Sequence, residues 1–115
     1  MLPEVAAKIV LVTCESEIQA WKIATAVVKK RLAACVNMVS APVQSVYRWR
    51  EKVETATEYL LIMKTTADRI SELQAEVLGL HSYDTPEFLV LGVEGGSAAY
   101  LEWIAQSVSG TGDKS

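Results

Sequence analysis

Hydrophobic and polar positions divide the chain into alternating strand-like and helix-like segments. Residues 8–14 form a nearly continuous, β-branched apolar run, which is typical of a strand covered on both faces. Ser16 with Gln19 three residues later is a capping-box signature, so a helix should follow. A spacing of three and four residues predicts the buried stripe of that helix at Ile18, Trp21, Thr25, Val28 and Leu32.

Two extended segments come next, over residues 35–50 and 53–65. Pro42 interrupts the first, and a proline inside a strand indicates an edge, a bulge or a break. Polar and apolar residues then alternate with the period of a strand up to Trp49. We expect the chain to reverse at residues 50–52, although the Asn-Gly or Asp-Gly of a tight hairpin is missing there.

The rest of the chain predicts two helices and one strand. Thr66 is expected to cap a helix whose buried stripe is Ile70, Leu73, Val77 and Leu80. Thr85-Pro86 ends that helix and opens a strand over residues 87–93. Ser97 should cap a third helix that buries Leu101, Ile104 and Val108, and residues 109–115 are expected to form a mobile tail.

This order is strand–helix–strand twice, followed by an extra helix. Two similar halves joined by a hairpin predict an α+β fold, the ferredoxin-like split β-α-β sandwich (βαββαβ) with an additional C-terminal helix. A length of 115 residues fits one domain, which we place at residues 1–108. The helices should then cover one face of a four-stranded antiparallel sheet.

The other face of that sheet is expected to need a cover. The first, third and fourth strands are apolar on both faces, yet the helices cover only one. A bare second face would exceed the roughly 300–600 Å² of the largest apolar patch on a typical monomer. The simplest cover is another copy of the chain, so we predict a closed homo-oligomer.

Composition and charge exclude several classes of protein. The net charge of −3 argues against a nucleic-acid binder, and no apolar run approaches the roughly 18–20 residues of a membrane span. Residues 1–4 show no secretory signal, so we expect a cytoplasmic protein in which Cys14 and Cys35 are reduced. The basic cluster at residues 29–31 suits the end of a helix dipole, and we prefer that interpretation to a phosphate-binding patch.

Four motifs carry a resemblance to a known family. They are Arg31-Leu32-Ala33-Ala34-Cys35-Val36-Asn37; Ser45, Tyr47 and Trp49 followed by Glu58 and Lys64-Thr65; His81-Ser82-Tyr83-Asp84-Thr85-Pro86-Glu87; and Tyr100-Leu101-Glu102-Trp103. In this order, over about residues 8–108, the chain resembles the CutA divalent-cation tolerance family.

The resemblance implies a ferredoxin-like homotrimer, similar in architecture to the PII signalling proteins. It also implies a role in the response to copper and other divalent metal ions, with copper bound by some members and no reaction firmly assigned. Three positions depart from the family. Val12 stands where copper-binding relatives have a cysteine, His81 is a single histidine, and Glu51 stands where a glycine is usual.

Cys14 and His81 are the candidate metal ligands. The first predicted strand ends where the fourth begins, so these two residues should lie close together and offer a thiolate and an imidazole to copper. Glu15 or Asp84 would add an oxygen. The alternative, which we favour, is that Cys14 is a small buried hydrophobe and His81 a polar loop residue. Copper is therefore expected as an optional ligand and not as a required cofactor.

The remaining candidates concern contacts between subunits. Tyr47 and Trp49 share a strand face and either pack against a neighbouring subunit or form the aromatic wall of a pocket. The polar residues Glu58, Lys64, Tyr83 and Glu87 match family positions. They either line a cleft between subunits or form a structural ion pair, such as Lys64 with Glu58 or Glu87. Arg48 and Arg50 are taken as solvated edge charges rather than anion ligands.

The motifs favour a protein that is not an enzyme. The first strand-to-helix junction has no glycine and carries Glu15, which argues against a phosphate-cradling loop, and one histidine allows few catalytic triads. We therefore predict a trimeric CutA-like protein of metal-ion tolerance. The alternative is a PII-like small-molecule sensor that holds its ligand between subunits.

Overall fold

The computed structural model describes residues 6–110 of the chain, and the expected tail beyond residue 110 lies outside them. The strands are β1 (Ala7–Cys14), β2 (Cys35–Met38), β3 (Val43–Trp49), β4 (Lys52–Thr66) and β5 (Leu89–Gly92). The helices are α1 (Glu17–Lys29), α2 (Ile70–Leu80) and α3 (Ala98–Ser107), with a short 3₁₀ turn η1 (Ala67–Arg69) before α2. The mixed α+β class that the sequence predicts is confirmed.

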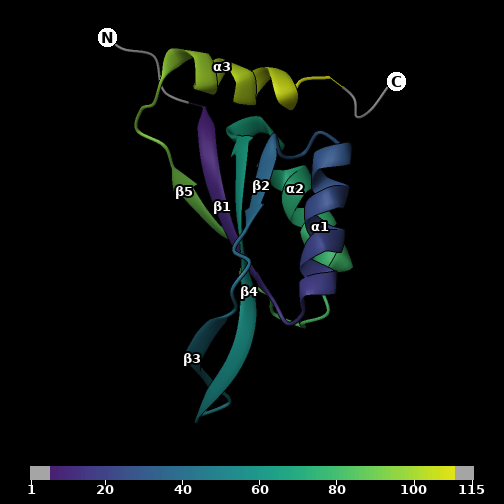
Figure 1. The fold of residues 1–115 in the computed structure, drawn as a ribbon, viewed down its shortest axis with the longest axis vertical. Coiled ribbons are helices and arrows are strands. Elements are labelled where there is room, and N and C mark those ends of the chain that lie inside the picture. The colour runs from purple at the N-terminus through teal and green to yellow at the C-terminus, as the bar shows by residue number, and fades with distance from the viewer. Residues whose placement is uncertain (1–5, 111–115) are drawn as a thin grey trace.

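The strands form one antiparallel sheet in the order β2-β4-β1-β5, and β3 pairs with β4. The strand β4 is 15 residues long because it pairs along its first half with β3 and along its second half with β1 and β2. The β3–β4 hairpin therefore projects from the body of the molecule (Figure 1). It accounts for much of the longest dimension of 47 Å.

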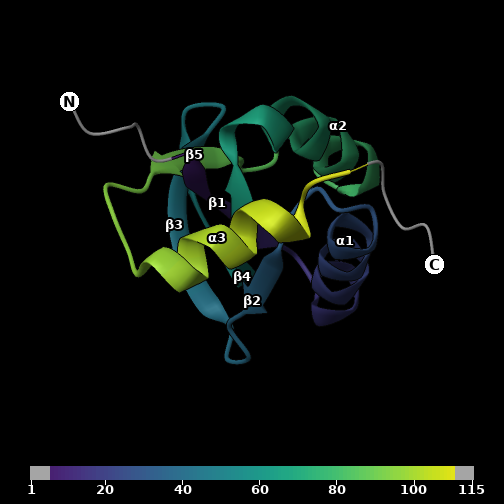
Figure 2. The ribbon, with the colours of Figure 1, turned by 90° about the horizontal axis from the view of Figure 1, so that it is seen from above.

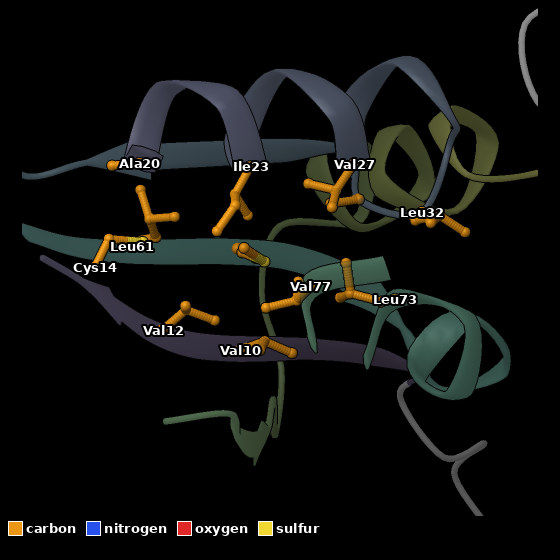
Figure 3. Packing of buried hydrophobic residues seen from close by; sticks show 12 residues of the cluster. Val10, Val12, Cys14, Ala20, Ile23, Val27, Leu32, Leu61, Leu73 and Val77 are labelled. Atoms are coloured by element: carbon orange, nitrogen blue, oxygen red, sulfur yellow. The ribbon is translucent and has the colours of Figure 1, made fainter. Parts of the chain in front are cut away.

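The core lies between one face of the sheet and the helices α1 and α2 (Figures 1 and 2). The alternation of β1 turns Val10, Val12 and Cys14 toward the helices, where all three are fully buried. Figure 3 shows these side chains facing Ile23 and Val27 of α1, with Leu61, Leu73 and Val77 completing the packing. These aliphatic side chains form a single core without a disulfide, and Cys14 and Cys35 are both free thiols.

The stripe predicted for α1 is wrong at four of its five positions. Ile18 is 83% exposed and Trp21 60% exposed, Thr25 and Val28 are also exposed, and only Leu32, just beyond the helix, is buried. The buried face of α1 is instead Ala20, Ile23, Ala24 and Val27. Both sets have helical spacing, so the period alone does not choose between them. The two alanines allow α1 to lie close to the sheet, whereas Trp21 would hold it away.

The N-caps of α1 and α3 and the buried stripes of α2 and α3 follow the prediction more closely. The N-cap serines Ser16 and Ser97 accept backbone hydrogen bonds from Gln19 and Tyr100, as expected. Leu73 and Val77 of the α2 stripe and Ile104 and Val108 of the α3 stripe are buried, as predicted. The other predicted positions, Ile70, Leu80 and Leu101, are partly buried.

Three predictions about the elements are wrong. The extended segment over residues 35–50 is two strands, β2 and β3, so the sheet has five strands and not the expected four. Thr66 does not cap α2, because the 3₁₀ turn η1 intervenes and the Thr66 hydroxyl donates to the Asp68 carboxylate instead. The last strand spans only residues 89–92 rather than 87–93.

The helix α3 lies across the end of the sheet at which β1 begins and β4 ends (Figure 2). Arg69 fixes this position, because its Nε donates to the carbonyl oxygen of Val108 at 2.8 Å. Arg31 adds a second contact from Nη1 to the carbonyl oxygen of Ser107 at 3.3 Å. The extra helix is therefore tied to both the α1 side and the α2 side of the molecule.

The face of the sheet opposite α1 and α2 is apolar and only partly covered. Strand alternation and register place six aliphatic side chains together on this face, which we call the outer face: Ile9, Leu11, Leu60, Ile62, Leu89 and Leu91. Leu89 and Leu91 are 55% and 46% exposed. The expectation that the chain leaves one face of its sheet uncovered therefore holds in the part described.

In residues 6–110, no helix combines the length and the apolar character needed to cross a membrane.

Candidate functional site

The ring of His81 lies beside the end of β1, as the topology predicts. Its Nε2 is 2.7 Å from the carbonyl oxygen of Thr13, and its Nδ1 accepts a hydrogen bond from the backbone N–H of Tyr83 at 3.1 Å. Because Nδ1 accepts, Nε2 carries the proton and donates to Thr13. Both ring nitrogens of His81 are therefore occupied by hydrogen bonds that join the loop after α2 to β1.

Cys14 is fully buried and belongs to the core cluster, next to Leu61 in Figure 3. Burial, and secondly the negative charge of Glu58, raises the pKa of Cys14 to about 11, so the thiol is protonated at neutral pH. A cysteine binds copper as the thiolate and not as the protonated thiol. Among the described residues, no three His, Cys, Asp or Glu side chains are grouped so as to hold a metal ion. The protonated thiol and the hydrogen-bonded ring oppose tight copper binding, and the copper site at Cys14 and His81 stays a prediction.

A cavity of about 850 Å³ lies between the β3–β4 hairpin and the loop that follows α2. It is lined by Thr13, Ser45, Val46, Tyr47, Trp49, Glu58, Ser82, Tyr83, Asp84, Thr85, Pro86 and Glu87. Five of the six residues predicted for an inter-subunit cleft are therefore in this one place. The sixth, Lys64, is six residues from Glu58 along β4, a separation of about 20 Å in a strand.

Glu58 is the most buried polar residue of the cavity, with 8% of its surface exposed. The hydroxyl of Tyr83 donates to Oε2 of Glu58 at 3.1 Å. Burial, this hydrogen bond and the nearby carboxylates all raise the pKa of Tyr83, so it remains a neutral donor. Burial, followed by the charge of Glu58, also raises the pKa of Glu87. The raised pKa of Glu87 therefore reflects first its partial burial and second the neighbouring charge of Glu58.

Among the described residues that line the cavity, three are acids (Glu58, Asp84 and Glu87) and none is a lysine, arginine or histidine. Tyr47 and Trp49 of β3 are each 43% exposed and supply aromatic surface. The guanidinium carbon of Arg50 lies 5.5 Å from the centroid of the Trp49 ring, within reach of a cation–π contact. The chemistry of the cavity therefore favours a positively charged ligand with apolar parts.

Six lining residues were not site candidates in the sequence, namely Thr13, Ser45, Val46, Ser82, Thr85 and Pro86. Thr13 is the last outward-facing residue of β1, and Ser82 and Thr85 belong to the loop that His81 ties to that strand. The sequence signals for these six residues are the end of the first strand for Thr13, the alternating strand for Ser45 and Val46, and the His81–Glu87 motif for the other three.

Comparisons with known proteins agree on one family. The model described as "CutA1 divalent ion tolerance protein" matches residues 8–107. The divalent-cation tolerance protein CutA of Thermus thermophilus is 41% identical over 100 residues, which cover 87% of this chain and 96% of the relative. Protein CutA of Mus musculus is 42% identical over 88% of this chain, and the aligned part spans 58% of the mouse protein.

Solved structures give the same result. The structure of the divalent cation tolerance protein from Thermus thermophilus has a TM-score of 0.86 at 40% identity, covering 88% of this chain and 97% of that one. The structure described as the periplasmic divalent cation tolerance protein CutA from Archaeoglobus fulgidus has a TM-score of 0.86 at 36% identity, covering 90% and 99%. From the sequence match, the shared fold and the motifs around the cavity together, this chain belongs to the CutA1 divalent ion tolerance family.

Proposed function

We propose that this protein acts in the response to divalent metal ions and catalyses no reaction. The observation that carries the proposal is the family match over residues 8–107, together with relatives that are named for divalent-cation tolerance. The second part is supported by His81, because two backbone hydrogen bonds hold its ring and leave it unsuited to act as a general base. The aligned region is somewhat over half of the mouse protein, so the role of a longer relative is not transferred whole.

We further propose that the fold is the ferredoxin-like βαββαβ arrangement and that three copies assemble. The antiparallel order β2-β4-β1-β5 supports the first point. The outer face supports the second, because Leu89 and Leu91 on it remain about half exposed in the single chain. Sedimentation equilibrium at low micromolar concentration should give three times the mass of the chain. A monomer would contradict the assembly.

Copper is proposed as an optional ligand and is expected to bind weakly at most. The buried, protonated thiol of Cys14 and the occupied ring of His81 both oppose tight coordination. Copper titration of the wild type and of His81→Ala tests the site directly. An affinity that is identical in the two proteins would remove His81 from any copper site.

The alternative is a PII-like sensor that holds a small molecule, and the acidic, aromatic cavity favours it. A ligand that binds only the folded state raises the melting temperature. Thermal shifts with copper, zinc, nucleotides and amino acids would therefore separate a metal from a metabolite.

The proposal places the protein in the cytoplasm, although the Archaeoglobus fulgidus structure is described as periplasmic.

A further inference from the structure

We propose that the cavity between the hairpin and the loop after α2 binds a small organic cation, an alkylammonium or guanidinium compound, against Glu58 and the aromatic side chains of β3. This inference deepens the sensor role and depends on it, because it names the class of ligand. It uses the cavity alone and not the copper residues Cys14 and His81.

The first argument is unbalanced charge. Glu58, Asp84 and Glu87 line the cavity, and none of them takes part in the two salt bridges found among residues 6–110, which are Lys30–Glu76 and Arg69–Glu72. A buried carboxylate is costly unless it is paired or well hydrogen-bonded. The hydroxyl of Tyr83 supplies one neutral hydrogen bond to Glu58 and no positive charge. A cationic ligand would provide the missing countercharge.

The second argument distinguishes an organic cation from a metal ion. A divalent metal needs several oxygen or nitrogen ligands converging at about 2.0–2.6 Å. In the described chain, the acids are too dispersed to form such a group. The cavity also presents Val46, Tyr47, Trp49 and Pro86, which offer little to a hydrated ion. Aromatic faces instead stabilise ammonium and guanidinium groups that carry an apolar body.

The third argument is that Trp49, which lines the cavity, already has a guanidinium over its ring, and that the cavity is large enough for a small ligand. The guanidinium of Arg50 lies over the ring of Trp49. The volume of about 850 Å³ falls within the roughly 300–1,000 Å³ typical of small-molecule sites. An alkyl chain a few carbons long would fit beside Tyr47 while its charged end reaches Glu58.

Isothermal titration of the full chain with cadaverine, a five-carbon diammonium, tests the proposal. Pentane-1,5-diol is the neutral control with the same carbon chain, and Mg²⁺ is the inorganic control. We expect cadaverine to bind and both controls to give no heat. Glu58→Gln should weaken cadaverine binding by about tenfold or more, because it removes a charged hydrogen-bond acceptor and preserves the shape of the side chain.

Two further variants guard against a folding artefact. Glu87→Gln removes a more exposed carboxylate of the same cavity and should weaken binding several-fold. Glu72→Gln removes an exposed carboxylate of α2 that does not line the cavity, and it should leave the affinity unchanged. If neither cadaverine nor agmatine binds, or if Glu58→Gln and Glu87→Gln bind as well as Glu72→Gln, the proposal is wrong.

The group that occupies the cavity could also be the guanidinium of an arginine from the hairpin of a second copy. The double variant Arg48→Gln/Arg50→Gln distinguishes this arginine from a free ligand. Equal binding by the wild type and the double variant supports a free ligand. Binding by the double variant alone would mean that a neighbouring arginine fills the cavity, which overturns the proposal. Sedimentation of the same samples keeps the two hypotheses separate. A trimer without cadaverine binding refutes only this inference, whereas a monomer refutes the proposed assembly.

Discussion

Cys14 shows what the sequence can predict about a single residue. Its place in a strand apolar on both faces indicated that it is either a buried hydrophobe or a ligand at the strand end, and the alternation of β1 turns it inward with Val10 and Val12. The residues around the cavity were found differently. The family motifs predict five of the cavity residues: Tyr47, Trp49, Glu58, Tyr83 and Glu87. Strand alternation could not predict that they lie together, because their proximity depends on how the hairpin meets the loop after α2. Lys64 shares those motifs, yet the rise of β4 carries it away from the cavity.

The raised pKa of Cys14 predicts a loss of stability in alkaline solution. The unfolded thiol ionises near its ordinary pKa of 9.0 and the folded thiol near 11, so between these values the unfolded state has released a proton that the folded state keeps, and unfolding becomes more favourable. The contribution of the protonated Cys14 thiol to the free energy of unfolding is fully present below pH 9. It falls by at most about 3 kcal/mol as the pH rises through 11. Urea unfolding of the wild type and Cys14→Ala between pH 8 and 11 measures the difference, in which lysine and tyrosine effects cancel. Parallel curves for the two proteins would show that Cys14 contributes nothing.

At the scale of the element, α1 shows the limit of periodicity. The helix carries two apolar arcs at the same spacing, and only packing against the sheet decides which is buried. In α2 and α3 the buried residues belong to the predicted stripes, although α3 also carries the exposed aromatic residues Tyr100 and Trp103.

Two isoleucines of α1 provide a matched test. Ile23 is fully buried and Ile18 is 83% exposed. Ile23→Ala should lower the free energy of unfolding by about 2–5 kcal/mol because it leaves a cavity in the core, whereas Ile18→Ala should change it by less than about 0.5 kcal/mol. Urea unfolding of both variants gives the comparison. Similar losses would mean that the outward face of α1 is also packed in the assembled protein.

The hairpin turn supplies a second test of an element. Arg50 and Glu51 have φ angles of 51° and 69°, in the left-handed region that glycine adopts most easily. The expected reversal is therefore present, but without the residues that favour it. Glu51→Gly should raise the free energy of unfolding by about 0.5–1 kcal/mol, and Glu51→Ala, which keeps the strain, should not. Thermal unfolding of the three proteins checks this order, and an equal gain for both variants would trace it to the lost charge instead.

At the scale of the whole molecule, the sequence predicts a sheet that the single chain cannot cover on both faces. Strands apolar on both faces require two covers, and α1 with α2 provides one of them (Figure 2). The short strand β5 lies at the edge of the sheet with Leu89, Val90 and Leu91 all at least 44% exposed. An apolar edge of this kind is a ready site for pairing with another chain.

The double variant Leu89→Asn/Leu91→Asn tests whether the outer face carries the assembly. Burying these two leucines between copies should contribute roughly 1.5–3 kcal/mol each, so their loss should raise the concentration at which the oligomer dissociates by at least about tenfold. The control Ile18→Asn/Val28→Asn makes the same kind of change on α1, where both side chains are exposed on the opposite side of the core. Sedimentation velocity across a dilution series should show dissociation only for the β5 variant. If the α1 variant dissociates and the β5 variant does not, the copies meet through the helix, and the outer face is covered by something other than this chain.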